Sequence, residues 1–171
     1  DVPYIIFRYA EALLNYAEAK AELGELTQAD VDLTINKLRA RVGMPNMTLA
    51  TIRTDPNWPD YGYTLSSALR EIRRERTVEL MAEGFRRDDI MRWAAHKLII
   101  GKRPKGAFYS DELKKAFTNL AVDAANYLDP YRTSLVGPGS TWGFDPAKHY
   151  LLPIPINEMT LNPAIKQNPG Y

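Results

Sequence analysis

Three glutamates, Glu75, Glu79 and Glu83, recur at intervals of four within a charge-dense segment of this chain. Side chains four residues apart lie on one face of a helix, so the three carboxylates are predicted to form a row. A pair of carboxylates can supply the acid and the base or nucleophile of glycoside hydrolysis. We interpret the row instead as partners in ion pairs on and between helices, and we expect no catalytic residue and no enzyme. The arginines that surround it are Arg73, Arg74, Arg76, Arg86 and Arg87.

Arg76 is expected to lie on the inward face of its helix, because it shares that face with apolar residues. A buried guanidinium is costly unless a carboxylate pairs with it. We therefore predict that Arg76 pairs with an acidic residue of the first helical hairpin. The candidate partners are Glu11, Glu18 and Glu22, and the apolar residues on the same face are Leu69, Ile72 and Leu80.

Metal, nucleophile and phosphate sites find no support in the sequence. Cysteine is absent, and the two histidines, His96 and His149, lie 53 positions apart with one acid, Asp145, within four positions of either. This spacing fits neither a metal site nor a catalytic triad. The glycines of segments 101–106 and 137–143 do not match a phosphate-binding loop, so we interpret both segments as turns. We expect no metal and no cofactor.

Aromatic residues in the predicted loops are the remaining candidates for ligand contact. A sugar presents flat C–H faces ringed by hydroxyls, so its site needs exposed rings next to side chains that donate and accept hydrogen bonds. Trp58 has Asn57 and Asp60 as polar neighbours. Packing beneath a loop is the alternative role for each ring. The candidate glycan-contacting residues are Trp58, Asp60, Tyr61, Tyr63 and Trp142.

The composition is that of an ordinary globular domain. Of the 171 residues, 45% are apolar and 25% are charged, so one domain over residues 1–171 is expected. The 22 basic and 21 acidic residues leave a net charge of +1, which argues against nucleic acid as a partner. No apolar run approaches the roughly 20 residues that span a bilayer.

A helical hairpin is predicted at the start of the chain. Apolar and polar residues alternate at helical spacing from about residue 6 to residue 23, and Gly24 ends this helix. Thr27 and Asp30 offer a cap for a second helix, which closes at Gly43. The inward positions of the second helix are Val31, Ile35, Leu38 and Val42. Small residues on the first helix allow the close packing of tetratricopeptide-like hairpins, namely Ala10, Ala17 and Ala21.

A second hairpin is predicted after a structured loop over residues 44–64. Its first helix starts at Thr64 or Ser66 and stops at Gly84, and a shorter helix runs through Ile90 and Trp93.

The rest of the chain is predicted to be rich in loops. Ser110 is a helix cap, and the stripe of that helix is Leu113, Phe117 and Leu120. Residues 127–149 are loop-like. Four prolines after residue 150 argue against a regular helix or an interior strand, so the tail is expected to wrap the helices in extended form.

Three blocks of sequence, in this order, resemble the carboxy-terminal half of SusD/RagB-family proteins. The first covers residues 4–24 and is rich in Ala, Glu and Leu. The second, over residues 73–93, contains Glu-Arg, Glu-Leu, Glu-Gly and a closing Arg-Trp. The third, over residues 150–171, contains Pro-Ile-Pro and ends in Asn-Pro-Gly-Tyr. Segments 44–64 and 95–149 follow no pattern that matches the family.

The resemblance implies an all-α domain of tetratricopeptide-like hairpins with long loops, within a longer protein. It also implies a non-catalytic role, in which a surface-exposed outer-membrane lipoprotein binds an oligosaccharide and delivers it to a SusC-like TonB-dependent transporter. The lipid anchor is expected in the front half of the protein. On the residues alone, an adaptor that holds a partner peptide or protein in a helical-repeat groove is the alternative.

Overall fold

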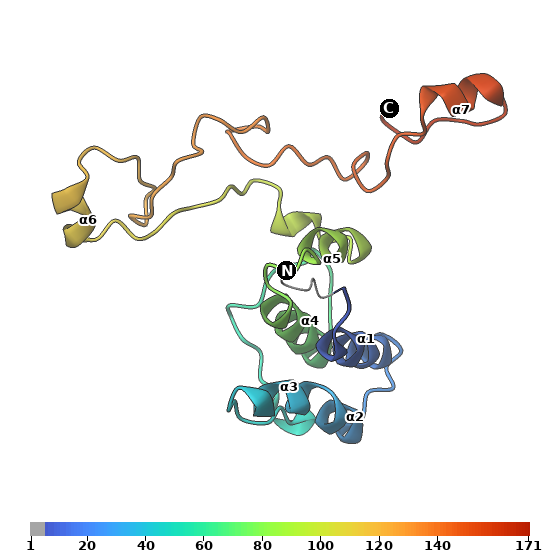
Figure 1. Ribbon diagram of the computed structural model, residues 1–171, viewed down its shortest axis with the longest axis vertical. Helices are drawn as coiled ribbons and strands as arrows, with labels where there is room; N and C mark the ends of the chain where they lie inside the picture. The colour runs from blue at the N-terminus through green and yellow to red at the C-terminus, as the bar shows by residue number, and fades with distance from the viewer. Residues whose placement is uncertain (1–5) are drawn as a thin grey trace, which may run out of the picture. The chain divides into compact units, whose positions relative to one another are not determined.

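The computed structural model shows a helical chain and describes residues 6–171 (Figure 1). Tyr4 and Ile5, which belong to the first block of the family resemblance, lie outside the described residues. Within the described range the backbone forms no sheet, and only isolated bridges such as that of Phe108 with Tyr127 join extended segments. The predicted all-α class is confirmed.

The chain divides into two compact units, of which unit 1 ends at Asp89 and unit 2 runs from Ile90 to Tyr171. The single domain expected over residues 1–171 stays a prediction. Helix α5 (Arg86–Arg92) begins in unit 1 and ends in unit 2. Unit 1 also contains α1 (Tyr9–Glu22), α2 (Gln28–Leu33), α3 (Ile35–Arg41), the 3₁₀ helix η1 (Leu49–Thr51) and α4 (Ser67–Glu79). Unit 2 contains η2 (His96–Leu98), α6 (Asp111–Ala116) and α7 (Ile156–Leu161). None of the helices in residues 6–171 combines the length and the apolar character that crossing a membrane requires.

Helices α1 and α4 lie side by side and make the most extensive helix contact of unit 1 (Figure 1). The predicted apolar face of the first helix is confirmed, because its inward residues form one buried cluster with residues of α2, α3 and α4. This packing positions the charged residues of α4 against α1. The buried cluster comprises Ala10, Leu13, Leu14, Ala17, Val31, Ile35, Leu38, Met47, Ile72 and Leu80.

The predicted second helix is two short helices in the structure. Thr27 caps α2 as predicted, since its hydroxyl accepts from the Asp30 N–H at 3.2 Å and the Asp30 carboxylate accepts from the Thr27 N–H at 2.9 Å. Thr34 then breaks the helix, with φ −118° and ψ −87°, and its hydroxyl donates to the Asp30 carbonyl at 2.6 Å. The chain restarts at Ile35, and Val42 is exposed. The prediction of one continuous helix with an inward Val42 is therefore wrong.

Helix α4 begins where one of the two predicted starts placed it. The Ser66 hydroxyl accepts from the Leu69 N–H at 3.2 Å and caps the helix. The helix ends at Glu79, before the predicted stop at Gly84, and Gly84 with φ +90° helps the chain turn into α5.

In unit 2 the apolar stripe of α6 and the conformation of the proline-rich tail differ from the predictions. Ser110 caps α6 as predicted, but α6 ends at Ala116, so Phe117 lies beyond the helix and is exposed, as is Leu120. The predicted apolar stripe is therefore wrong. The proline-rich tail forms the short helix α7, because Pro155 precedes its first turn, where no N–H is needed, and Pro163 follows its last. The wrapping of the helices by the tail stays a prediction.

Candidate functional site

Arginines pair with all three glutamates, of which Glu75 and Glu79 lie on α4 and Glu83 lies beyond its end, and this confirms the interpretation as ion pairs. Glu75 accepts from the Arg39 Nε at 2.8 Å. Arg8 contacts both Glu79 and Glu83, each through an N–O distance of 2.6 Å. The hydrogen bond from Arg8 lowers the pKa of the Glu83 carboxyl. A general acid in glycoside hydrolysis needs a raised pKa, so this environment opposes such a role.

Arg76 is buried, as its position on the helix predicted, but its partner differs from the prediction. Its Nε donates to both oxygens of Asp89 at 2.8 Å, and its Nη1 donates to the Asn15 Oδ1 at 2.8 Å. The side chains of Arg76 and Asp89 are 5% and 4% exposed. The pairing with Glu11, Glu18 or Glu22 is therefore wrong, because the turn after α4 brings Asp89 within hydrogen-bonding distance of Arg76.

Glu18 and Glu22 pair with Arg73 instead. The Arg73 Nη2 lies 2.7 Å from Glu22, and its Nε lies 3.8 Å from Glu18, whose side chain is also buried. The Arg73 Nη1 donates to the Tyr63 hydroxyl at 2.8 Å, and its Cζ lies 5.2 Å from the centre of the Tyr61 ring. Arg73 therefore connects α1 to the loop that holds two of the predicted site residues.

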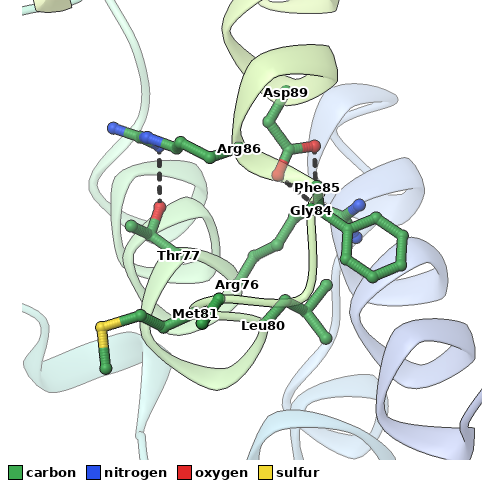
Figure 2. A pocket seen from close by; sticks show the side chains of 9 residues that line it. Arg76, Thr77, Leu80, Met81, Gly84, Phe85, Arg86 and Asp89 are labelled. Carbon is green, nitrogen blue, oxygen red and sulfur yellow. Dashed lines mark hydrogen bonds and ion pairs between the residues drawn. The ribbon is translucent and has the colours of Figure 1, made fainter. Parts of the chain in front are cut away.

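An apolar cavity of about 490 Å³ opens where α4 turns into α5. Figure 2 shows the Arg76–Asp89 ion pair at this cavity with the Phe85 ring beside the guanidinium, whose Cζ lies 5.5 Å from the ring centre. Arg86 donates to the Thr77 hydroxyl at 3.0 Å (Figure 2). Because these polar groups already have partners, the cavity suits an apolar group better than a sugar with its many hydroxyls.

Trp58 is half-buried against α4. Its Nε1 donates to the Glu71 Oε1 at 2.8 Å, and the Arg70 Cζ lies 5.8 Å from its ring centre. Glu71 also lines a polar cavity of about 210 Å³, so Trp58 bonds to a residue in the wall of this cavity. The other polar side chains that line this cavity include Asn46, Thr48, Thr51 and Arg53.

The other predicted residues of this loop differ in accessibility. Asp60 is exposed, and its carboxylate accepts from the Gly62 N–H at 2.8 Å. Tyr63 is 40% exposed, whereas Tyr61 is 1% exposed and packs against Arg73. Tyr61 therefore has the packing role that was the alternative for each ring, and the surface of this loop is formed by the other residues.

Trp142 lies in unit 2 and is 44% exposed. It follows a tight turn in which the Gly137 N–H donates to the Thr141 carbonyl at 3.0 Å. The Trp142 N–H donates to the Lys102 carbonyl at 3.0 Å. The predicted turn over residues 137–143 is confirmed, and it leaves a large ring accessible to solvent.

A buried carboxylate near this turn was missed by the sequence reasoning. Asp129 is 3% exposed and pairs with Arg103 at 2.6 Å and with Lys105 at 2.7 Å. The basic turn at residues 101–106 was the available signal, but nothing in the sequence indicates which acid it meets. No group of three or more histidine, cysteine or acidic side chains that could hold a metal ion occurs in residues 6–171.

Acid is expected to destabilise unit 2 through Asp129. Hydrogen bonds from Arg103 and Lys105 hold the pKa of the Asp129 carboxyl well below its usual range. A depressed pKa stabilises the folded state above the unfolded pKa of about 4, and this contribution is lost as the pH falls through the folded value. Asp129→Asn should therefore show a smaller loss of stability between about pH 6 and pH 3 than the wild type. Urea denaturation at both pH values measures it, and equal losses in the two proteins would contradict the assignment.

Comparisons with known proteins point to one family. A model of the SusD family matches residues 1–171. SusD-like protein P38 of Formosa agariphila is 38% identical over 93 residues, which cover 54% of this chain and 17% of that protein. The crystal structure of a SusD-like carbohydrate binding protein from Bacteroides fragilis is 32% identical with a TM-score of 0.62, and the match covers 94% of this chain and 28% of that chain. This chain therefore spans less than a third of the length of either relative.

Proposed function

The chain belongs to the SusD family, and from this premise we propose that it is part of a protein that binds glycans without cleaving them. The observation that carries the proposal is the match over 94% of the chain to a solved relative described as carbohydrate binding. The family match over residues 1–171 supports it.

Two surface positions are proposed as glycan contacts. On unit 1, Trp58 donates to Glu71, which lines the polar cavity, and Asp60 and Tyr63 are exposed in the same loop, so the loop offers rings and hydrogen-bonding groups. On unit 2, Trp142 offers an exposed ring. Aromatic rings stack on the apolar faces of sugars while polar neighbours bind the hydroxyls, and this combination supports the proposal.

We propose that the protein does not cleave its ligand, because its candidate catalytic carboxylates are engaged in ion pairs. The three acidic residues whose spacing could suit hydrolysis are paired with arginines. The hydrogen bond from Arg8 lowers the pKa of the Glu83 carboxyl, which makes Glu83 a poor proton donor at neutral pH. Incubation of the full-length protein with the oligosaccharide it binds, followed by product analysis, tests this point.

We further propose that the whole protein is lipid-anchored at the outer-membrane surface and delivers its ligand to a SusC-like TonB-dependent transporter. Membership of the SusD family supports this assignment. Co-purification of the transporter with the tagged full-length protein from outer membranes tests the partnership.

The alternative is an adaptor for a peptide, which the apolar cavity at the α4–α5 corner favours. A glycan array and a peptide array probed with the full-length protein separate the two functions. Saccharide binding supports the receptor, and binding to peptides alone supports the adaptor.

Replacement of Trp58 or Trp142 by alanine in the full-length protein is expected to weaken glycan binding roughly 5- to 30-fold, since one stacked ring contributes about 1–2 kcal/mol. Isothermal titration with the best-binding oligosaccharide from the glycan array measures the change. Phe117→Ala is the matched control, because Phe117 is an exposed ring outside both proposed contacts. Unchanged affinity in both tryptophan variants would show that the ligand binds elsewhere in the protein.

A further inference from the structure

One arginine of unit 2 connects a buried carboxylate to the turn before Trp142. The Arg103 Nε and Nη2 donate to the two oxygens of Asp129 at 2.7 and 2.6 Å. Its remaining nitrogen, Nη1, donates to the Gly139 carbonyl at 3.1 Å. A guanidinium is planar and carries its donors in a fixed fork, so the bidentate pair with Asp129 sets the direction in which Nη1 points. Arg103 thereby fixes the position of Gly139.

The turn itself has little freedom to adopt another shape. The Thr141 hydroxyl donates to the Pro138 carbonyl at 2.8 Å, and the Thr141 side chain is buried. A Cβ atom on Gly137 would lie 2.3 Å from the Thr141 carbonyl oxygen, so the close approach of the two strands of the turn requires glycine. The turn is therefore compact, and its orientation depends on what holds it from outside.

Two neighbouring residues hold the turn at two points. The Lys102 carbonyl accepts from the Trp142 N–H at 3.0 Å, and the Arg103 side chain contacts Gly139 at the tip. Asp129 is itself fixed, because its N–H donates to the Ala121 carbonyl at 2.8 Å. Trp142 is thus an exposed ring on a backbone that is anchored to the interior of unit 2.

We propose that Arg103, oriented by Asp129, is a positioning residue that holds the Trp142 ring in the geometry in which it binds glycan. This inference rests on the proposed function of Trp142 as a glycan contact. A ring that is already fixed loses less conformational entropy when a ligand binds, so preorganisation of the turn raises affinity without adding a contact. Arg103 therefore affects glycan binding by holding the turn that precedes Trp142, and not by contacting the glycan.

Lys105 provides a matched control for Arg103. Its Nζ lies 2.7 Å from the same oxygen of Asp129 and 3.4 Å from Asp123. Within residues 6–171, Lys105 makes no hydrogen bond to the turn over residues 137–142. Loss of Lys105 and loss of Arg103 each remove one cation from Asp129, but only loss of Arg103 removes a bond to the turn.

The test uses Arg103→Gln and Lys105→Gln in the full-length protein, with two measurements. Hydrogen exchange at the Trp142 amide reports whether the turn is held, because this N–H bonds to Lys102. Titration with the best-binding oligosaccharide from the glycan array reports the effect on binding. Arg103→Gln should lower amide protection about 10-fold and affinity about 3- to 10-fold, whereas Lys105→Gln should leave both within about 2-fold. Urea denaturation of both variants measures their global stability for comparison.

Arg103→Lys keeps a positive charge beside Asp129, and it replaces Arg103→Gln in the test if that variant does not fold. A lysine cannot bond to Asp129 and Gly139 through a rigid fork, so this variant should show the same loss of protection at Trp142. The proposal is overturned if both Arg103 variants keep wild-type protection, or if Lys105→Gln lowers protection as much as Arg103→Gln. If Trp142→Ala leaves affinity unchanged while Arg103→Gln releases the turn, the glycan contact is wrong and the positioning of the turn is upheld.

Discussion

Replacement of Arg76 by alanine is expected to lower the free energy of unfolding by about 3–5 kcal/mol, the usual loss when one member of a buried ion pair is removed. Arg76 bonds to both oxygens of Asp89 and to Asn15, and neither charged side chain is more than 5% exposed. The variant would remove the guanidinium that bonds to both oxygens of the buried Asp89 carboxylate. The midpoint of urea denaturation measures the loss.

Three further variants separate the ion pair from other effects of the Arg76 substitution. Asp89→Ala should be about as costly, and the double variant should cost less than the sum of the two single variants, because both single variants already lose the same interaction. Arg74→Ala is the matched control on the same helix, since the Arg74 side chain is 41% exposed and should contribute about 1 kcal/mol or less. A loss below about 0.5 kcal/mol for Arg76→Ala would contradict the burial of the pair.

The burial of Arg76 was predictable, but its partner was not. Helical spacing placed Arg76 on the same face as Ile72 and Leu80, and spacing is a local property. The partner depends on the turn after Glu79, where the helix ends before Gly84 and the chain brings Asp89 to Arg76. Several acids lie at suitable helical positions, so sequence alone cannot decide which of them a tertiary turn brings into contact.

The boundaries of the helices were also predicted only where they depend on neighbouring residues. The caps at Thr27, Ser66 and Ser110 were predicted, because capping uses side chains within three residues of the helix start. The break at Thr34 was missed, since its hydroxyl competes for a backbone carbonyl inside an otherwise regular apolar pattern. Helix α7 was missed because its prolines occur at its ends, where they are tolerated.

The sequence identified the candidate site residues, but it did not predict which of them are exposed to solvent. Composition identified the aromatic loop residues, but it did not distinguish Tyr61, which is buried beneath its loop, from Trp142, which is exposed. Burial of a loop ring depends on distant residues, here on Arg73 of α4. The contact between Arg103 and Asp129 joins residues 26 positions apart through irregular backbone, where no periodic pattern exists.

The arginines of α4 have distinct roles in the architecture of unit 1. Arg74 pairs with Asp55 in the loop, Arg73 pairs with α1, and Arg76 reaches α5 and α1. Because each bonds to a different element, α4 fixes the arrangement of its neighbours through polar contacts as well as through its apolar face. The charge-dense segment that suggested chemistry is therefore the structural centre of unit 1.

Replacement of Arg73 by alanine is expected to cost about 3–5 kcal/mol, since it would leave the buried Glu18 carboxylate without this cation. Arg73 also bonds to Glu22 and to the Tyr63 hydroxyl, and its guanidinium lies over the Tyr61 ring. Arg73→Lys keeps the positive charge but loses the planar group, so a loss of about 1–3 kcal/mol is expected. Urea denaturation gives both values.

The same variants are expected to change the candidate loop, which gives this prediction a second measurement. Near-ultraviolet circular dichroism reports the packing of Tyr61 and Tyr63, and Arg73→Ala should reduce that signal in the folded protein. Arg70→Ala is the control, because Arg70 lies over Trp58 and donates to the Pro59 carbonyl at 3.2 Å, so its loss should cost about 1 kcal/mol or less. If Arg73→Ala and Arg70→Ala destabilise the protein equally, Arg73 is not the link between α1 and this loop.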